Sequence, residues 1–209
     1  MPETGISLLH LHTAYEEWLG RPNALFELRT RQADKHVPSE LDLLLFQPPN
    51  NEKLPDEEQF TYIATAGLST CKMPRTRPLM EVIIRVDGAY PFDVLEELGR
   101  KIAEIAVLPF REKNQFYPNL LIYPVQLPLF EGMGYLLVTN WAVESEKWLF
   151  VQKRRVLMLN LIPLFESEAQ IVGEIGDREA SRRFLAENIN WYNPKRAPAH
   201  LGLLPLDSE

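Results

Sequence analysis

FTYIATAGLSTCKM, residues 60–73, begins with the residue types of a β-strand and ends in small and hydroxylated residues. Phe60 to Ala66 predicts a strand. Gly67 predicts a bend directly after it, because glycine adopts backbone torsions that other residues avoid. Ser69 and Cys71 follow in that bend, and Cys71 is the single cysteine of the chain. The first question is therefore whether this bend carries catalytic chemistry.

One reading of the bend is a hydrolase site. Gly67 to Thr70 after a strand is similar to the G-x-S-x-G nucleophile elbow, whose glycines allow a turn that exposes the serine. Residue 71 is Cys instead of Gly, and Pro74 interrupts the helix that an elbow requires. The distant candidate bases are His36 and His200. We therefore expect a structural turn, with hydrolysis by Ser69 or Cys71 as the alternative function.

Composition restricts the class of protein. The chain has 209 residues, of which 45% are hydrophobic, so it is long enough for one domain with a substantial core. We predict that this domain spans residues 1–190 and that residues 191–209 form a proline-containing tail, either mobile or docked by its leucines. No internal repeat is present.

Charge and cysteine content indicate the environment and the partners. The net charge of −7 disfavours nonspecific binding to nucleic acid or to an anionic membrane, both of which require clustered Lys and Arg. One cysteine excludes an intramolecular disulfide, which is typical of a reducing compartment. No segment approaches the roughly 18 apolar residues of a membrane span, so we predict a cytoplasmic protein.

The first helix is predicted from apolar residues at helical spacing, ended by Gly20. These apolar residues are Leu8, Leu11, Tyr15, Trp18 and Leu19. His10 and His12 lie in this helix, but residues two apart point to different faces and do not hold a metal together. The sequence therefore predicts neither a metal site nor a cofactor.

Several apolar runs predict strands. They are Leu25 to Thr30, Leu41 to Phe46, Met80 to Val86, Leu120 to Tyr123, Tyr135 to Thr139 and Val156 to Ile162. Met80 to Val86 alternates in the manner of a strand with one buried face. Val156 to Ile162 is apolar on both faces, which predicts a central strand, and Pro163 is expected to end it.

Three further helices are predicted beside these strands, and the last of them contains Phe184 and Leu185. Leu95, Leu98, Ile102 and Ile105 form the apolar stripe of the first. Asp93 with Glu96, and Ser167 with Gln170, have the spacing of capping boxes at helix N-termini.

The order of four motifs resembles one known family. Thr65, Gly67 and Ser69, with Met73 beyond them, are similar to the T-x-G-M-S segment and downstream Met of the suppressor of fused (SUFU) domain family, with Leu68 in place of the usual Met. The other matching segments are Pro22 to Glu27, Leu41 to Pro48, and Leu161 to Leu164 with Glu168. The resemblance covers about residues 20 to 187.

This resemblance implies a single α+β domain, with a mixed β-sheet packed by amphipathic helices, that binds another protein and is not an enzyme. Eukaryotic members of the family sequester a transcription factor partly by strand pairing. Short bacterial members are similar to immunity proteins that neutralise a cognate toxin. The length and acidity of this chain favour the second use, with a basic toxin domain as the expected partner. A structural or scaffold subunit is the third alternative.

Candidate partner-binding residues come from a polar loop and two tryptophans. Asp56, Glu57 and Glu58 are consecutive acids in the loop from Asn50 to Gln59. Trp141 and Trp148 flank a short acidic segment, and tryptophan is enriched in interface hot spots. Both features also fit ordinary roles, since acidic runs are commonly solvated loops and tryptophans commonly pack in cores.

Overall fold

The computed structural model describes residues 4–29, 37–56, 58–73, 78–140 and 148–199. The elements in chain order are α1 (Leu8–Leu19), β1 (Ala24–Arg29), β2 (Glu40–Phe46), η1 (Asn51–Lys53), β3 (Phe60–Ala66), η2 (Leu68–Thr70), β4 (Leu79–Asp87), α2 (Phe92–Ala106), α3 (Leu108–Arg111), β5 (Leu120–Ile122), β6 (Tyr135–Thr139), β7 (Trp148–Val151), β8 (Arg154–Leu164), α4 (Glu166–Ile175) and α5 (Asp177–Ala186). This arrangement confirms the predicted α+β domain.

The strands form one mixed sheet of eight strands in the order β1-β2-β3-β4-β8-β6-β5, with β7 paired to β8. The β4–β8 pair is parallel and the other pairs are antiparallel. β8 pairs with three strands, so its central position agrees with its apolar sequence.

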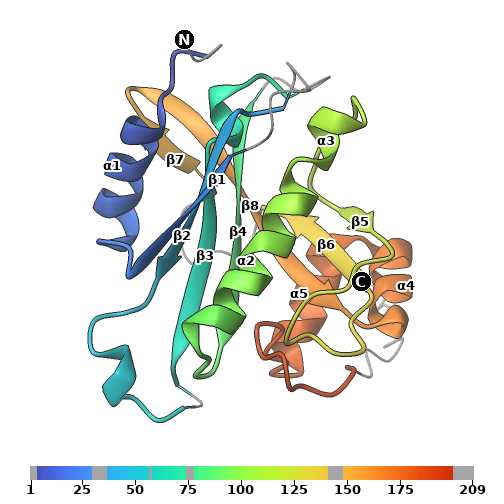
Figure 1. The fold of residues 1–209 in the computed structure, drawn as a ribbon. Helices are drawn as coiled ribbons and strands as arrows, with labels where there is room; N and C mark the ends of the chain where they lie inside the picture. Colours follow the sequence, from blue (N-terminus) through green and yellow to red (C-terminus); the bar gives the residue numbers. More distant parts are fainter. Residues whose placement is uncertain (1–3, 30–36, 57, 74–77, 141–147, 200–209) are drawn as a thin grey trace.

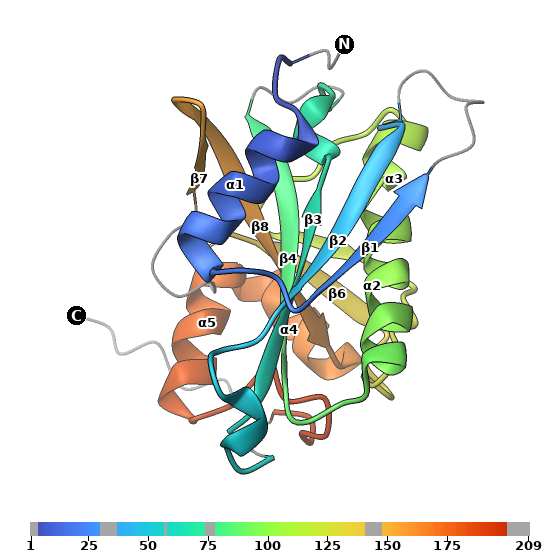
Figure 2. The same cartoon turned by 60° about the vertical axis from the view of Figure 1, so that its left-hand side comes forward.

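Helices cover both faces of this sheet (Figures 1 and 2). Alternate residues of β2 point to opposite faces, so Leu43 and Leu45 pack in the cluster that contains α2, while Leu44 packs in the cluster that contains α1. In β8, Met158 packs toward α1 and Ile162 toward α4 and α5. Residues at even spacing share a face, so α1, α4 and α5 cover the face opposite α2.

The prediction of one buried face for β4 was wrong. Glu81 and Ile83, expected on the solvent side, are 0% and 1% exposed. Ile83 packs in the cluster of α1, because the N-terminal helix lies over this part of the sheet. A strand buried on both faces must satisfy any charged side chain internally, which makes Glu81 a special position.

Three predicted boundaries also need correction, namely the end of β8 at Pro163 and the starts of α2 and α4. Pro163 does not end β8, which continues to Leu164 with Pro163 opposite Leu136. α2 begins at Phe92, so Asp93 lies inside its first turn and not at the cap. α4 begins at Glu166, before the predicted cap at Ser167. There the Glu168 side chain accepts a hydrogen bond from the Phe165 N–H at 3.0 Å.

Residues 191–199 lie against α4 and α5. The Trp191 ring packs edge-on against Phe184, with 5.6 Å between ring centroids. The buried Glu168 carboxylate pairs with Arg196 and accepts a hydrogen bond from the Ala199 N–H at 2.8 Å. The leucines expected to dock the tail lie outside the described residues, and the domain boundary at residue 190 stays a prediction.

A buried polar motif and an open groove

Gly67 ends β3 in a conformation that favours glycine. Its φ is 140° and its ψ is −24°. A Cβ atom at this position would lie 2.5 Å from the Glu40 carbonyl oxygen and 3.1 Å from the Leu41 Cα, both in the backbone of β2. The bend and the glycine torsion expected at Gly67 are therefore present, and the backbone of β2 also leaves no room for a side chain there.

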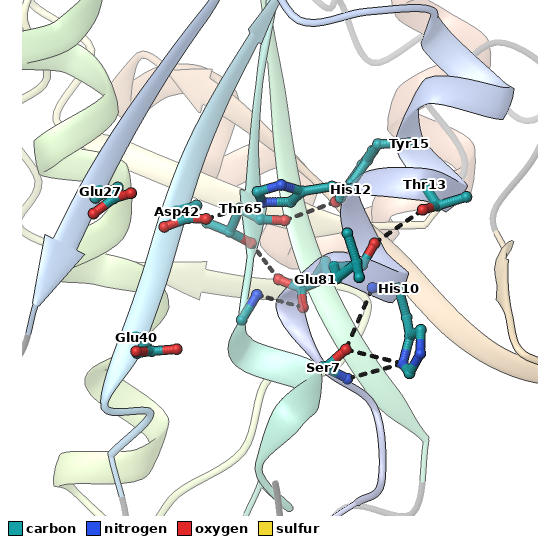
Figure 3. A network of polar contacts seen from close by, with 12 residues as sticks. Ser7, His10, His12, Thr13, Tyr15, Glu27, Glu40, Asp42, Thr65 and Glu81 are labelled. Carbon is teal, nitrogen blue, oxygen red and sulfur yellow. Dashed lines mark hydrogen bonds and ion pairs between the residues drawn. The ribbon is translucent and has the colours of Figure 1, made fainter.

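The residues that follow Gly67 surround the Glu81 carboxylate. Glu81 Oε1 accepts hydrogen bonds from the Gly67 N–H at 3.0 Å, the Ser69 N–H at 2.9 Å and the Ser69 Oγ at 2.7 Å. Glu81 Oε2 accepts from the Thr65 Oγ1 at 2.7 Å and the Leu68 N–H at 3.3 Å. The small and hydroxylated residues of the bend therefore act as a donor shell for one buried carboxylate. Figure 3 shows the Thr65 side chain beside this carboxylate.

The environment of Glu81 changes its acidity. Burial raises the pKa of the Glu81 carboxyl, and the hydrogen bonds from Ser69, Thr65 and Gly67 act in the opposite direction. Sequence reasoning missed this residue. The available signal was a carboxylate in the middle of an apolar strand, Leu79 to Asp87, close to a run of hydrogen-bond donors.

The N-terminal segment covers this motif. The Tyr15 hydroxyl donates to the Thr65 carbonyl oxygen at 2.8 Å. The Tyr15 pKa is raised mainly by burial and to a smaller extent by the charge of Glu81. The Thr4 Oγ1 donates to the Ser69 carbonyl oxygen at 2.7 Å. His12 Nε2 lies 2.9 Å from Asp42 Oδ2, and this contact joins α1 to β2 (Figure 3). Burial raises the Asp42 pKa, and His12 partly offsets that shift.

Ser69 meets one requirement of a nucleophile and lacks another. Its hydroxyl lies 2.7 Å from the Glu81 carboxylate, so a candidate base is within hydrogen-bond reach. Ser69 and Glu81 are however both 0% exposed, and Thr4 of the N-terminal segment contacts the Ser69 backbone. A substrate carbonyl has no route to the Ser69 oxygen in this conformation. Cys71 is half-buried, and its sulfur lies 3.8 Å from the Thr70 hydroxyl.

The other two predicted motif residues pack in the interior. Met73 is 6% exposed, and its sulfur accepts a hydrogen bond from the Phe116 N–H at 3.4 Å. Pro163 is buried in β8. Neither residue contacts the Glu81 carboxylate among the hydrogen bonds of the described residues, so the structure brings together Thr65, Gly67 and Ser69 only.

The predicted partner-binding residues lie on separate parts of the surface. Asp56 and Glu58 are exposed in the loop after η1. Trp148 is half-buried in β7, a strand that sequence reasoning did not predict. Glu57 and Trp141 lie outside the described residues. An interface role for these residues stays a prediction.

An open groove of about 750 Å³ runs between α2 and the segment that follows β5. Its apolar lining includes Ile105, Leu108, Ile122 and Val125. Glu97 and Glu104 from α2 also line it, and Lys101 between them pairs with Glu104 at 2.9 Å. β5 forms one end of the sheet order, so its outer edge has no strand partner among the described residues. A free sheet edge beside an apolar groove is suited to bind an extended peptide.

Among the described residues, no three His, Cys, Asp or Glu side chains gather as metal ligands would. None of the described helices has the length and apolar content that crossing a bilayer requires.

Comparison with known proteins decides the family. The family model of the suppressor of fused protein (SUFU) matches residues 38–197, which include the whole Glu81 motif. The chain belongs to the suppressor of fused family. The resemblance predicted from the sequence is therefore confirmed.

Solved suppressor of fused structures share the fold. A homologue from Neisseria gonorrhoeae FA 1090 is 14% identical, with a TM-score of 0.61 over 91% of this chain and 93% of that chain. Drosophila Suppressor of Fused is 14% identical, with a TM-score of 0.62 over 95% of this chain and 51% of that chain. A chain of the Sufu–Fu complex is 13% identical, with a TM-score of 0.56 over 95% of this chain and 93% of that chain. No curated protein sequence matches the chain.

Proposed function

We propose that this chain is a non-enzymatic domain that binds another protein in the cytoplasm and neutralises it, as an immunity protein neutralises its cognate toxin. The observation that carries the proposal is the burial of the family motif. Ser69 and Glu81 are 0% exposed and hydrogen bonded to each other, so the motif stabilises a fold and offers no atom to a substrate. A structure of the same fold was solved as the Sufu–Fu complex, which supports a binding role.

The groove beside β5 supports protein binding as the mode of action. Ile105 and Ile122 supply apolar contact area, and the outer edge of β5 supplies backbone donors and acceptors. Glu97 contributes a carboxylate at the rim and forms no ion pair within the described residues. These features suit a peptide with apolar side chains and a basic residue, which agrees with a basic toxin domain.

The acidic loop is expected to accelerate association with such a partner. Asp56 and Glu58 are exposed, and complementary charge raises association rates over a Debye length of about 8 Å at physiological salt. Reversing Asp56, Glu57 and Glu58 to Lys should slow association and leave the fold intact, because exposed charges contribute little to stability. Surface plasmon resonance across a salt series measures both the rate and its screening.

A matched charge reversal elsewhere on the surface distinguishes the effect of the loop from the effect of the net charge. Glu16 and Glu17 on α1 and Glu174 on α4 are also exposed, and their reversal to Lys changes the net charge equally. Association slowed equally by both triple variants would assign the effect to net charge. Rates equal to wild type in the loop variant, or salt-independent association of the wild type, would show that the loop does not steer the partner.

The second candidate function is hydrolysis, which the contact of 2.7 Å between Ser69 and Glu81 favours. Our proposal predicts that Ser69→Ala and Cys71→Ala both retain partner binding and protection against the toxin. Circular dichroism first establishes that each variant is folded, since Ser69→Ala removes a buried hydrogen bond. Loss of activity in a folded variant would favour the enzyme.

Co-purification of the partner from cells that carry the chain tests the proposal against a scaffold role. An inhibitor suppresses the activity of the protein that it captures. A scaffold subunit binds its partner and leaves that activity unchanged.

A further inference from the structure

The hairpin of β7 and β8 has an unusual turn. Gln152 and Lys153 connect the two strands and have φ angles of 47° and 65°. A two-residue turn with two positive φ angles is normally built from Asn and Gly, because other residues are strained there. Gln152 is held by His10 of α1, with 2.6 Å between the side-chain nitrogens. Gln152 and Lys153 therefore hold the tip of the hairpin in a conformation that glycine would adopt more easily.

The tip of this hairpin concentrates positive charge. Lys153, Arg154 and Arg155 are consecutive and exposed, and none of them pairs with a carboxylate among the described residues. By contrast, the described cations that pair with carboxylates include Arg29, Arg85, Arg100, Lys101, Arg182, Arg183 and Arg196. The chain carries a net charge of −7, so the tip of the hairpin is a positively charged patch on an acidic protein.

Aromatic side chains lie next to these cations. Trp148 and Phe150 are two residues apart on β7 and share the face opposite Leu149, which packs toward α1. Phe150 is 55% exposed, and the Arg155 guanidinium lies 5.8 Å from the centre of its ring. β7 pairs with β8 only, so its outer edge has no strand partner in the described part of the chain.

We infer that this hairpin is a docking surface for an acidic, extended segment of a partner protein. The three cations attract carboxylates, Phe150 and Trp148 supply apolar contact, and the free edge of β7 supplies backbone hydrogen-bonding groups. A membrane surface or a nucleic acid fits less well, because the rest of the chain is strongly acidic and is repelled by an extended polyanion. This surface has the opposite charge to the acidic loop and shares no residue with the lining of the groove beside β5.

The test uses a fluorescein-labelled peptide of eight alternating Glu and Val residues as the probe. Fluorescence anisotropy should detect binding to the wild-type chain that weakens as salt increases. The double variant Lys153→Glu/Arg155→Glu should lower the affinity at least tenfold. It keeps Arg154, whose guanidinium donates to the Thr4 carbonyl oxygen, so the N-terminal segment remains attached. Phe150→Ser should also weaken binding, which a purely electrostatic contact does not predict.

The matched control is Arg111→Glu/Arg178→Glu, an equal change of charge at exposed positions of α3 and α5. This variant should retain the wild-type affinity. Absence of peptide binding to the wild type, or equal weakening by the control, would overturn the inference. Tighter binding to phosphatidylserine vesicles than to the peptide would assign the surface to a membrane. A wild-type dimer that dissociates only in the hairpin variant would assign it to a second copy of the chain.

Discussion

Replacing Gly67 with alanine is expected to lower the free energy of unfolding by about 2 to 4 kcal/mol. The new Cβ would lie 2.5 Å from the Glu40 carbonyl oxygen, which belongs to the β2 backbone and cannot rotate away. The φ of 140° adds strain for any residue other than glycine. Relief of the contact would move the N–H groups of residues 67 to 69 away from Glu81. Urea denaturation followed by circular dichroism measures this decrease in the free energy of unfolding.

Gly173→Ala is the matched control, because the same methyl group is added inside α4. A Cβ at Gly173 meets no atom within 4 Å, and alanine favours helix over glycine by about 1 kcal/mol. This control is therefore expected to be neutral or stabilising. An unchanged denaturation midpoint in Gly67→Ala would mean that the bend tolerates a side chain and that the motif has no structural requirement for glycine.

Glu81→Gln is expected to destabilise the protein by about 2 to 4 kcal/mol despite its nearly unchanged shape. The Ser69 and Thr65 hydroxyls can rotate and accept hydrogen bonds from the new amide, but backbone N–H groups cannot. If the amide oxygen occupies the Oε1 position, the Leu68 N–H faces the amide nitrogen. If the amide oxygen occupies the Oε2 position, the N–H groups of Gly67 and Ser69 face the amide nitrogen instead. Either orientation leaves a buried donor without an acceptor.

Thermal unfolding of Glu81→Gln beside Glu97→Gln measures this effect. Glu97 is exposed on α2, so the same substitution there is expected to change stability by less than about 0.5 kcal/mol. Equal, small changes in the two variants would show that the donors around Glu81 find other partners, and that the carboxylate does not organise the motif.

Local sequence patterns predicted the strands because each apolar run has its own period and length. The strand Phe60–Ala66 and the bend at Gly67 follow from residue types that lie next to one another. β7 escaped prediction because its four residues, Trp148 to Val151, are too few to establish a period. Pro163 was misread as a strand end, although its position opposite Leu136 keeps it within β8.

The centre of the motif was not predictable from local patterns. Glu81 is separated from Ser69 by twelve positions, and their contact depends on the pairing of β3 with β4 and on coverage by α1. Alternation along β4 placed Glu81 on a solvent face, since the pattern does not reveal which later layer covers that face. The residues of the T-x-G-x-S segment were found, but the carboxylate that explains their types was not.

The most direct test of the central claim is the stoichiometry of neutralisation. The co-purified partner, held at a concentration well above the dissociation constant, is titrated with the wild-type chain and with folded Ser69→Ala while its activity is measured. A binding inhibitor removes that activity in proportion to its concentration, with an end point at a fixed ratio of the two proteins that is the same for both chains. Progressive loss of activity at amounts of chain far below the partner concentration, abolished in Ser69→Ala, would show turnover and contradict the account.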